Sequence, residues 1–224
     1  MMSTEYSILN LFNGSNSPFM DAFVSTFSMG YTWILFYVTL IVLVIKNNKT
    51  MAQIFLALSC ALLACILAGG VADFIVKPLT ARLRPCDDSE LLGLIRLVPD
   101  YHVKGYSFYS AHAANTMALT AFMFLLVRSK YLTLSMVLWT LFTAYTRLYL
   151  GVHWPSDVLV GLLVGLIAGI VAYIVYFKLY YRISPHTHYI SSHYTSTGYS
   201  HSDIDACLSV IVFTVIYVIF KSLI

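Results

Sequence analysis

Long apolar stretches alternate with short polar ones along the whole chain. Six predominantly apolar stretches contain no Asp, Glu, Lys or Arg, namely residues 22–45, 50–72, 105–127, 131–146, 158–177 and 206–220. An α-helix needs about 20 predominantly apolar residues to cross a bilayer, and the shorter stretches reach this length with their neutral neighbours. The pattern therefore predicts an all-α protein, a polytopic membrane helical bundle with about six transmembrane helices.

The composition supports a membrane protein. The chain has 224 residues, of which 59% are hydrophobic and 10% are charged, and its mean hydropathy is +0.80. Its net charge of +3 is too small and too dispersed for a protein that binds nucleic acid. The four cysteines show no metal-ligand spacing, so we expect neither a disulfide framework nor a zinc site.

We expect a single membrane-embedded domain over residues 1–224, with three notable segments outside the spans. Residues 1–18 mix apolar residues with Asn, Ser and Gly, which is typical of a short amphipathic segment lying on the membrane surface. Residues 77–109 form the one long loop, and loops of this length in compact proteins are usually functional. Residues 183–203 form a polar linker, in which irregular histidine spacing favours a solvated loop over a metal site. Its histidines are His186, His188, His193 and His201.

Residues 146–157 place a cation, an imidazole and a carboxylate between two apolar stretches. Charge near hydrocarbon is costly and usually marks function. Pro155 fits the first turn of a new helix, so His153 should precede that helix and Asp157 should lie in its first turn. Asp157 can then reach back to one imidazole nitrogen and leave the other free as a nucleophile. Arg147 offers a planar fork that suits phosphate oxygens.

Polar residues also open the third predicted span. Ser110 and His112 stand at a helix N-terminus, where free N–H groups and the helix dipole favour an anion. A single histidine on an apolar helix is more often structural. We nevertheless favour a functional role for His112, because His153 and several cations stand at other span ends that the topology can bring to the same place.

The long loop is rich in cations, which are Lys77, Arg82, Arg84, Arg96 and Lys104. A run of charges on a loop is commonly just a solvated surface. On a helix, Asp73 and Lys77 would share a face, and we interpret Asp73 mainly as the partner that holds Lys77 in place.

Three groups of residues carry a resemblance to a known family. They are Lys77 with Arg84-Pro85, Ser110 with Ala111 and His112, and Arg147 with His153 and Asp157. Their order and spacing, over about residues 70–160, resemble the three-part signature of the type-2 phosphatidic-acid phosphatase superfamily. Tyr109 and Ala111 depart from the Pro and Gly usual in the second part, and Thr146 replaces the usual Ser in the third. These departures bear on substrate range or rate more than on the chemistry.

The resemblance implies a phosphatase without metal or other cofactor. His153 would attack phosphorus in line to form a phosphohistidine, while Asp157 orients and supports its imidazole. His112 would protonate the leaving oxygen and then activate the hydrolytic water. The sequence leaves three roles for Arg82, namely a supporting contact to the site residues, a contact to a pyrophosphate, or simple solvent exposure. The phosphate-binding residues would be Lys77, Arg84, Ser110, Ala111 through its N–H, and Arg147.

The cations at the span ends predict an orientation. By the positive-inside rule, the turns with Lys46, Lys49, Arg128, Lys130, Lys178 and Arg182 are cytoplasmic. We therefore expect a multi-pass protein of the bacterial inner (cytoplasmic) membrane, with its active site and both termini facing the periplasm or exterior.

A site at the membrane surface suits an amphiphile with its phosphate at the interface and its tail in lipid. Our first choice of substrate is undecaprenyl pyrophosphate, whose hydrolysis returns the carrier lipid for cell wall synthesis. Phosphatidylglycerophosphate, phosphatidic acid and lipid A remain open. A vanadate-dependent oxidant and a non-catalytic lipid-phosphate binding or transport protein are less favoured alternatives, because mere anion binding needs neither an orienting carboxylate nor an acid. No obligate protein partner is evident.

Overall fold

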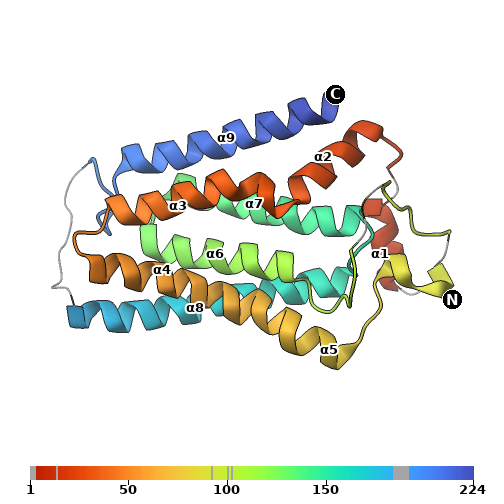
Figure 1. Cartoon of the computed structure of the whole chain (residues 1–224), viewed down its shortest axis with the longest axis horizontal. Coiled ribbons are helices and arrows are strands. Elements are labelled where there is room, and N and C mark those ends of the chain that lie inside the picture. Colours follow the sequence, from red (N-terminus) through yellow and green to blue (C-terminus); the bar gives the residue numbers. More distant parts are fainter. Residues whose placement is uncertain (1–3, 14, 92, 100, 102, 184–191) are drawn as a thin grey trace.

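The computed structural model is a bundle of helices that run roughly along one long axis (Figure 1). It describes residues 4–13, 15–91, 93–99, 101, 103–183 and 192–224. Among these residues there is no strand, only one isolated bridge between Tyr194 and Ser200. The predicted fold class, an all-α membrane bundle, is confirmed.

The first part of the chain forms α1 (Thr4–Asn13), α2 (Pro18–Ser28), α3 (Ile34–Lys46), α4 (Met51–Cys65) and α5 (Lys77–Thr80). The second part forms α6 (Ala111–Val127), α7 (Lys130–Tyr149), α8 (Pro155–Ile183) and α9 (His201–Leu223). Two π-helical stretches, Ile66–Gly70 and Ala72–Val76, connect α4 to α5. Lys77, which the sequence places at the start of a loop, therefore continues a helix. Short 3-10 turns follow at Pro85–Asp87 and Ser89–Leu91.

Three helical stretches of the described chain are long and apolar enough to cross a membrane, namely Met51–Leu91, Pro155–Ile183 and His201–Leu223. The helices Pro18–Ser28 and Gly30–Lys46, bent by 66°, make a fourth if they count as one span. α6 is apolar but shorter, and α7 carries threonines and an arginine. Both run alongside the other helices (Figure 1). The prediction of about six spans therefore stays a prediction for α6 and α7.

α6 and α8 pack closely because α8 presents glycines to α6. A Cβ on Gly165 would lie 2.2 Å from the carbonyl oxygen of Ala114, and one on Gly161 would lie 2.6 Å from that of Ser110. Small residues let membrane helices approach to backbone contact. The N-termini of α6 and α8 are joined directly, since the N–H of Ser110 donates to the carbonyl of Asp157 at 3.0 Å.

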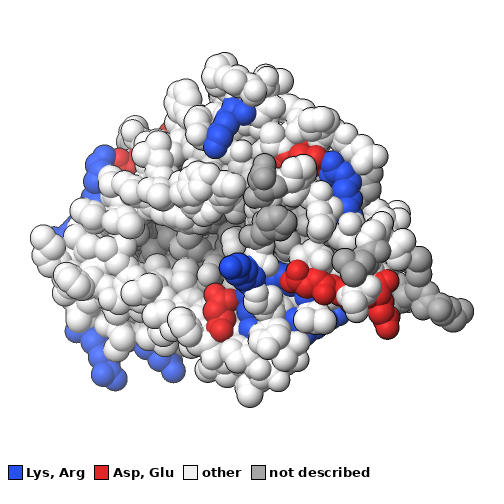
Figure 2. Space-filling model, turned by 45° about the vertical axis from the view of Figure 1, so that its right-hand side comes forward, with Lys and Arg blue, Asp and Glu red and all other residues white. Residues whose placement is uncertain are grey.

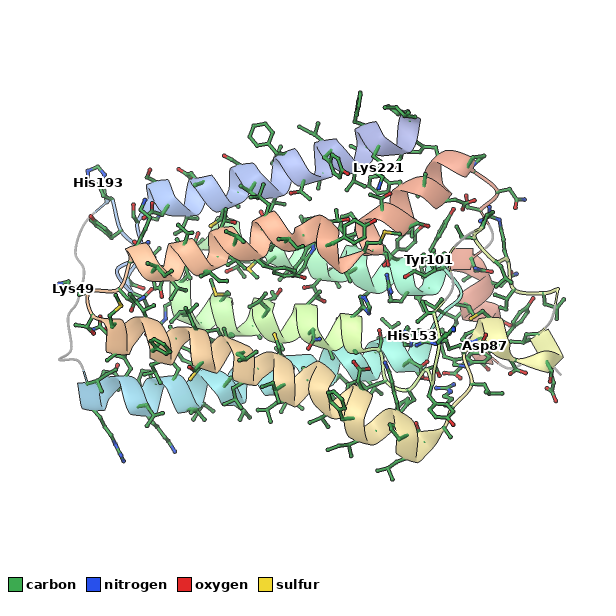
Figure 3. All side chains as sticks on the ribbon, in the orientation of Figure 1. Lys49, Asp87, Tyr101, His153, His193 and Lys221 are labelled. Atoms are coloured by element: carbon green, nitrogen blue, oxygen red, sulfur yellow. The ribbon has the colours of Figure 1, made fainter. Side chains whose placement is uncertain are left out.

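The two ends of the bundle differ in what they carry. His153, Tyr101 and Asp87 lie at one end, and Lys49 and His193 lie at the other (Figure 3). α1 and the C-terminal end of α9 lie at the same end as His153 (Figure 1). This arrangement agrees with the predicted separation of the motif-bearing loops from the basic turns.

The segments outside the spans differ in detail from the prediction. α1 packs on the protein, because Tyr6 and Leu9 are buried against Ile95. α8 continues to Ile183 and α9 begins at His201, so the polar linker is shorter than residues 183–203. The predictions for His186 and His188 fall outside the described residues.

Candidate active site

The predicted site residues come from four parts of the chain that backbone hydrogen bonds join at one end of the bundle. Besides the contact between Ser110 and Asp157, the N–H of Cys86 donates to Gly151 at 3.1 Å. The N–H of Ser107 donates to the carbonyl of Arg82 at 2.9 Å. Residues far apart in sequence thereby surround one place. Figure 2 shows basic and acidic side chains gathered beside one another on this end.

His153 and Asp157 face each other as predicted. Pro155 begins α8, His153 precedes it, and both His153 and Asp157 are buried. Nδ1 of His153 lies 3.5 Å from Oδ2 of Asp157, which is long for a hydrogen bond. Nδ1 has no closer partner among the described residues. Asp157 itself is firmly held, because Oδ2 accepts the N–H of Trp154 at 3.0 Å and Oδ1 accepts Nη1 of Arg82 at 2.7 Å.

The contact with Arg84 favours one orientation of the His153 imidazole. Its buried guanidinium donates to the carbonyls of Gly105 at 2.9 Å and Val152 at 2.8 Å, and Nη1 lies 3.3 Å from Nε2 of His153. A guanidinium can only donate, so Nε2 must present its lone pair. The ring proton of the neutral imidazole is then on Nδ1, toward Asp157.

The surroundings of His153 favour its neutral form. Burial lowers the pKa of His153 to about 4, and the nearby Arg84 and Arg147 also lower it, while Asp157 opposes them. A neutral imidazole with a lone pair on Nε2 is the form that a nucleophile requires.

Arg147 is fixed from several sides in the last turn of α7. It is 1% exposed. Its Nη1 donates to the hydroxyl of Tyr101 at 3.1 Å, its Nη2 to the carbonyl of Ser28 at 3.4 Å and its Nε to the hydroxyl of Thr146 at 3.2 Å. The sequence predicts Arg147 and Thr146 but not Ser28 or Tyr101. For Tyr101, the only available signal was its place in the long loop.

Lys77 and His112 complete the group of cations and imidazoles. Nζ of Lys77 lies 2.6 Å from Oδ1 of Asp73, which confirms the predicted pair. His112 lies in the first turn of α6, with an exposed side chain. Arg147, Lys77, Arg84 and His153 all lie close enough to His112 to influence its protonation electrostatically. We conclude that these groups share one site.

Ser110 lies at the N-terminus of α6, as predicted, and the structure shows that it caps the helix. Its buried hydroxyl accepts the N–H of Ala113 at 3.5 Å. Ala111 is the first residue of α6, so its own N–H has no acceptor within the helix. This N–H can therefore donate to an anion.

Arg82 donates to Oδ1 of Asp157, the carboxylate oxygen that does not face His153. Its Nη1 contacts both Ser156 Oγ at 2.8 Å and Asp157 Oδ1 at 2.7 Å, and its Nη2 contacts Glu5 Oε2 at 2.5 Å. The guanidinium carbon also lies 5.3 Å from the ring centre of Trp154. Of the three roles left open for Arg82, the structure supports the contact to the site residues.

Taken together, the arrangement offers an oriented nucleophile, a second imidazole and several cations around one place. Such a site can bind a phosphate group, stabilise its charge and transfer it to an imidazole. Among the described residues, no three His, Cys, Asp or Glu side chains gather as a metal site would require. The metal-free mechanism stays a prediction.

Comparison with known proteins agrees with this chemistry. Residues 56–181, more than half of the chain, match the model of the PAP2 superfamily. A lipid A 4'-phosphatase of Bacteroides thetaiotaomicron is 34% identical over 69% of this chain and 68% of its own length. An undecaprenyl-diphosphatase of Sulfolobus acidocaldarius is 30% identical over 62% of this chain and 61% of its own length.

A solved structure shares the fold. It is the transmembrane PAP2 type phosphatidylglycerolphosphate phosphatase from Bacillus subtilis, with a TM-score of 0.58 and 19% identity. The match covers 82% of this chain and 87% of that one. At this identity the likeness concerns the fold alone.

Proposed function

We propose that this chain, which belongs to the PAP2 superfamily and is a membrane lipid phosphatase, removes a phosphate group from lipid A or a closely similar glycolipid. The sequence alone favours undecaprenyl pyrophosphate. The observation that changes this order is the position of Arg82, which could have bound the second phosphate of a pyrophosphate. It is instead shared between Asp157 and Glu5. The relative named lipid A 4'-phosphatase points the same way.

Undecaprenyl pyrophosphate remains the second candidate. The relative named undecaprenyl-diphosphatase favours it, at somewhat lower identity and over less of the chain. Both candidates carry a phosphate at the membrane interface, so they would use the same catalytic groups.

In the proposed reaction, a substrate phosphate takes over the Nη1 donor of Arg84 and also meets Lys77 and Arg147. Nε2 of His153 attacks phosphorus, and the bond from phosphorus to the lipid oxygen breaks as His112 gives that oxygen a proton. Asp157 supports the imidazole as it becomes cationic.

The second half of the reaction returns the enzyme to its starting state. His112 takes a proton from water, and the resulting hydroxide attacks phosphorus. The bond between phosphorus and Nε2 of His153 then breaks, and inorganic phosphate leaves. The cations stabilise charge on the equatorial phosphate oxygens in both halves.

We place this activity in the bacterial inner membrane, with the site facing the periplasm. The turns at the other end carry Lys46, Lys49, Arg128, Lys130, Lys178 and Arg182. Lys46 there is paired with Asp203. At the site end, three cations of the described chain are paired with carboxylates, namely Lys77 with Asp73, Arg82 with Glu5 and Arg96 with Asp21. The positive-inside rule therefore favours this orientation.

The test is phosphate release by the purified protein in detergent from lipid A, undecaprenyl pyrophosphate, phosphatidylglycerophosphate and phosphatidic acid, each with and without EDTA. We expect the highest kcat/KM on lipid A, no effect of EDTA, and no release by His153→Ala. A preference for undecaprenyl pyrophosphate would restore the first choice from the sequence. Release from none of these lipids by folded protein would favour the non-catalytic binding or transport alternative.

A further inference from the structure

The N-terminal helix reaches the candidate active site through one carboxylate. α1 docks on the loops at the site end, where Asn13 donates to the carbonyls of Arg96 at 3.0 Å and Tyr149 at 2.8 Å. This anchoring holds the first turn of α1 beside Arg82. Glu5, in that first turn, contacts the guanidinium.

A series of contacts leads from α1 toward the imidazole, and its last step, from Asp157 to His153, is longer than a hydrogen bond. Oε2 of Glu5 lies 2.5 Å from Nη2 of Arg82, and Nη1 of Arg82 lies 2.7 Å from Oδ1 of Asp157. Oδ2 of the same carboxylate faces Nδ1 of His153. A guanidinium is a planar fork, so fixing one of its ends on Glu5 also fixes the end that points at Asp157.

We propose that Glu5 and Arg82 are positioning residues that hold Asp157, and through it His153, so that α1 is part of the active site. The proposal rests on the phosphatase function. It changes the role of residues 1–18, for which the sequence indicates only a segment on the membrane surface.

Arg82 has an electrostatic effect besides a geometric one. Asp157 accepts one charged donor, Arg82, and one neutral donor, the N–H of Trp154. The charged and titratable groups that influence the pKa of His153 are Asp157 of α8, Arg84 of the loop, Arg147 of α7 and His112 of α6. Removing the charge of Arg82 would leave Asp157 less neutralised, which would raise the pKa of His153.

The first test is Glu5→Gln, which keeps the size of the side chain and removes its charge. We expect kcat on the best lipid of the panel to fall roughly tenfold, about the effect of losing one charge-assisted hydrogen bond. KM should not change, because Glu5 contacts Arg82 and is not one of the groups that we assign to phosphate binding. Glu5→Asp should recover part of kcat. Glu90→Gln is the matched control, because Glu90 is the other glutamate of the chain and is exposed.

The second test reads out His153 without substrate. In ¹⁵N-histidine NMR of the detergent-solubilised protein, with His153→Gln for assignment, Arg82→Met should shift the titration of His153 to higher pH. Glu90→Gln should leave it at the wild-type position. This measurement remains valid even if none of the lipids in the panel is the substrate.

The outcomes separate the two proposals. Wild-type kcat and KM in Glu5→Gln, on a lipid that the wild type hydrolyses, would remove α1 from the site and leave the phosphatase function intact. An unchanged His153 titration in folded Arg82→Met would remove Arg82 from its role. If Arg82→Met does not fold, Glu5→Gln and Glu5→Asp still decide the matter. Turnover of no lipid by the wild type would count against the proposed function alone.

Discussion

Nη1 of Arg84 lies 3.3 Å from Nε2 of His153, although the two residues are 69 positions apart in sequence. A guanidinium 3.3 Å from Nε2 and a carboxylate 3.5 Å from Nδ1 favour the orientation in which the Nε2 lone pair faces Arg84 and the Nδ1 proton faces Asp157. In the proposed reaction, the same guanidinium also binds the phosphate that His153 attacks. One pair thus links the binding of the anion to the choice of attacking atom.

Replacing His153 and replacing His112 should affect different steps of the reaction. His153→Ala removes the proposed nucleophile, so turnover should fall by at least about 10³-fold, to the level of the remaining electrostatic effects. His112→Ala leaves the nucleophile in place but removes the group that activates water. It should accumulate a phosphoenzyme, provided that the leaving group departs without its help.

Rapid quench with ³²P-labelled lipid checks this difference. The ³²P label on His112→Ala should be released by acid, as it is from a phosphohistidine. The double variant His112→Ala/His153→Ala should carry no label. A label that survives in the double variant would place the nucleophile elsewhere. Normal turnover by His153→Ala would do the same.

The pH dependence should reflect the buried imidazole. Protonation of His153 blocks attack, and its pKa is lowered to about 4 from 6.5 for a free histidine. The acid limb of kcat/KM should therefore lie near pH 4, and activity should persist at pH 5.5. Because a substrate phosphate also titrates near pH 6, NMR titration of His153 without substrate is the control. An imidazole that titrates near 6.5 would contradict the inferred environment.

The contact between α6 and α8 should not tolerate a methyl group. The Cβ of Gly165→Ala would lie 2.2 Å from the carbonyl oxygen of Ala114, so the two helices would have to separate. Overpacking of this kind costs roughly 1–3 kcal/mol, and each kcal/mol lowers Tm by about 2–4 °C in a chain of this size. Activity should fall as well, because the separation shifts His112 relative to Asp157.

Gly30→Ala is the matched control for Gly165→Ala. A Cβ at Gly30 would have no heavy atom within 4 Å. Thermal unfolding in detergent should therefore show a lower Tm for Gly165→Ala alone. Equal Tm values for the two variants would mean that the helices do not approach as closely as the structure has them.

Cysteine labelling should reveal the orientation in the membrane. Glu90→Cys lies at the site end and Lys130→Cys begins α7 at the other end, and both positions are exposed. With a membrane-impermeant maleimide on spheroplasts, we expect rapid labelling of Glu90→Cys and labelling of Lys130→Cys only after lysis. The reverse pattern would mean that the site faces the cytoplasm. Background from Cys86 should be slow, because burial and Asp87 raise the pKa of its thiol to about 11.

The helical architecture was accessible from the sequence because it follows from local properties. Apolar stretches of sufficient length predict spans. Pro155 predicts the start of α8, and Ser110 and His112 are expected at the N-terminus of a helix, which is α6. The spacing of Asp73 and Lys77 predicts their ion pair. These inferences need only the geometry of a single helix.

The residues that hold the site together could not be found this way. Glu5 is the single charged residue among the first twenty, but nothing in the sequence indicates that α1 returns to Arg82. Tyr101 and Ser28 contact Arg147 only because a loop and the end of α2 meet at α7. Such contacts depend on how several elements pack, which no local pattern encodes.

The helical membrane fold and the set of candidate catalytic groups could be predicted from the sequence, because hydrophobic length and the chemistry of individual side chains are local properties. Three contacts appear only in the fold: Arg82 donates to Asp157, Nε2 of His153 faces Arg84, and Glu5 of α1 contacts Arg82. Side-chain orientation and charge pairing depend on distances between residues that are far apart in the chain. Those distances are set by the close packing of α6, α7 and α8 and by the loops that this packing brings together.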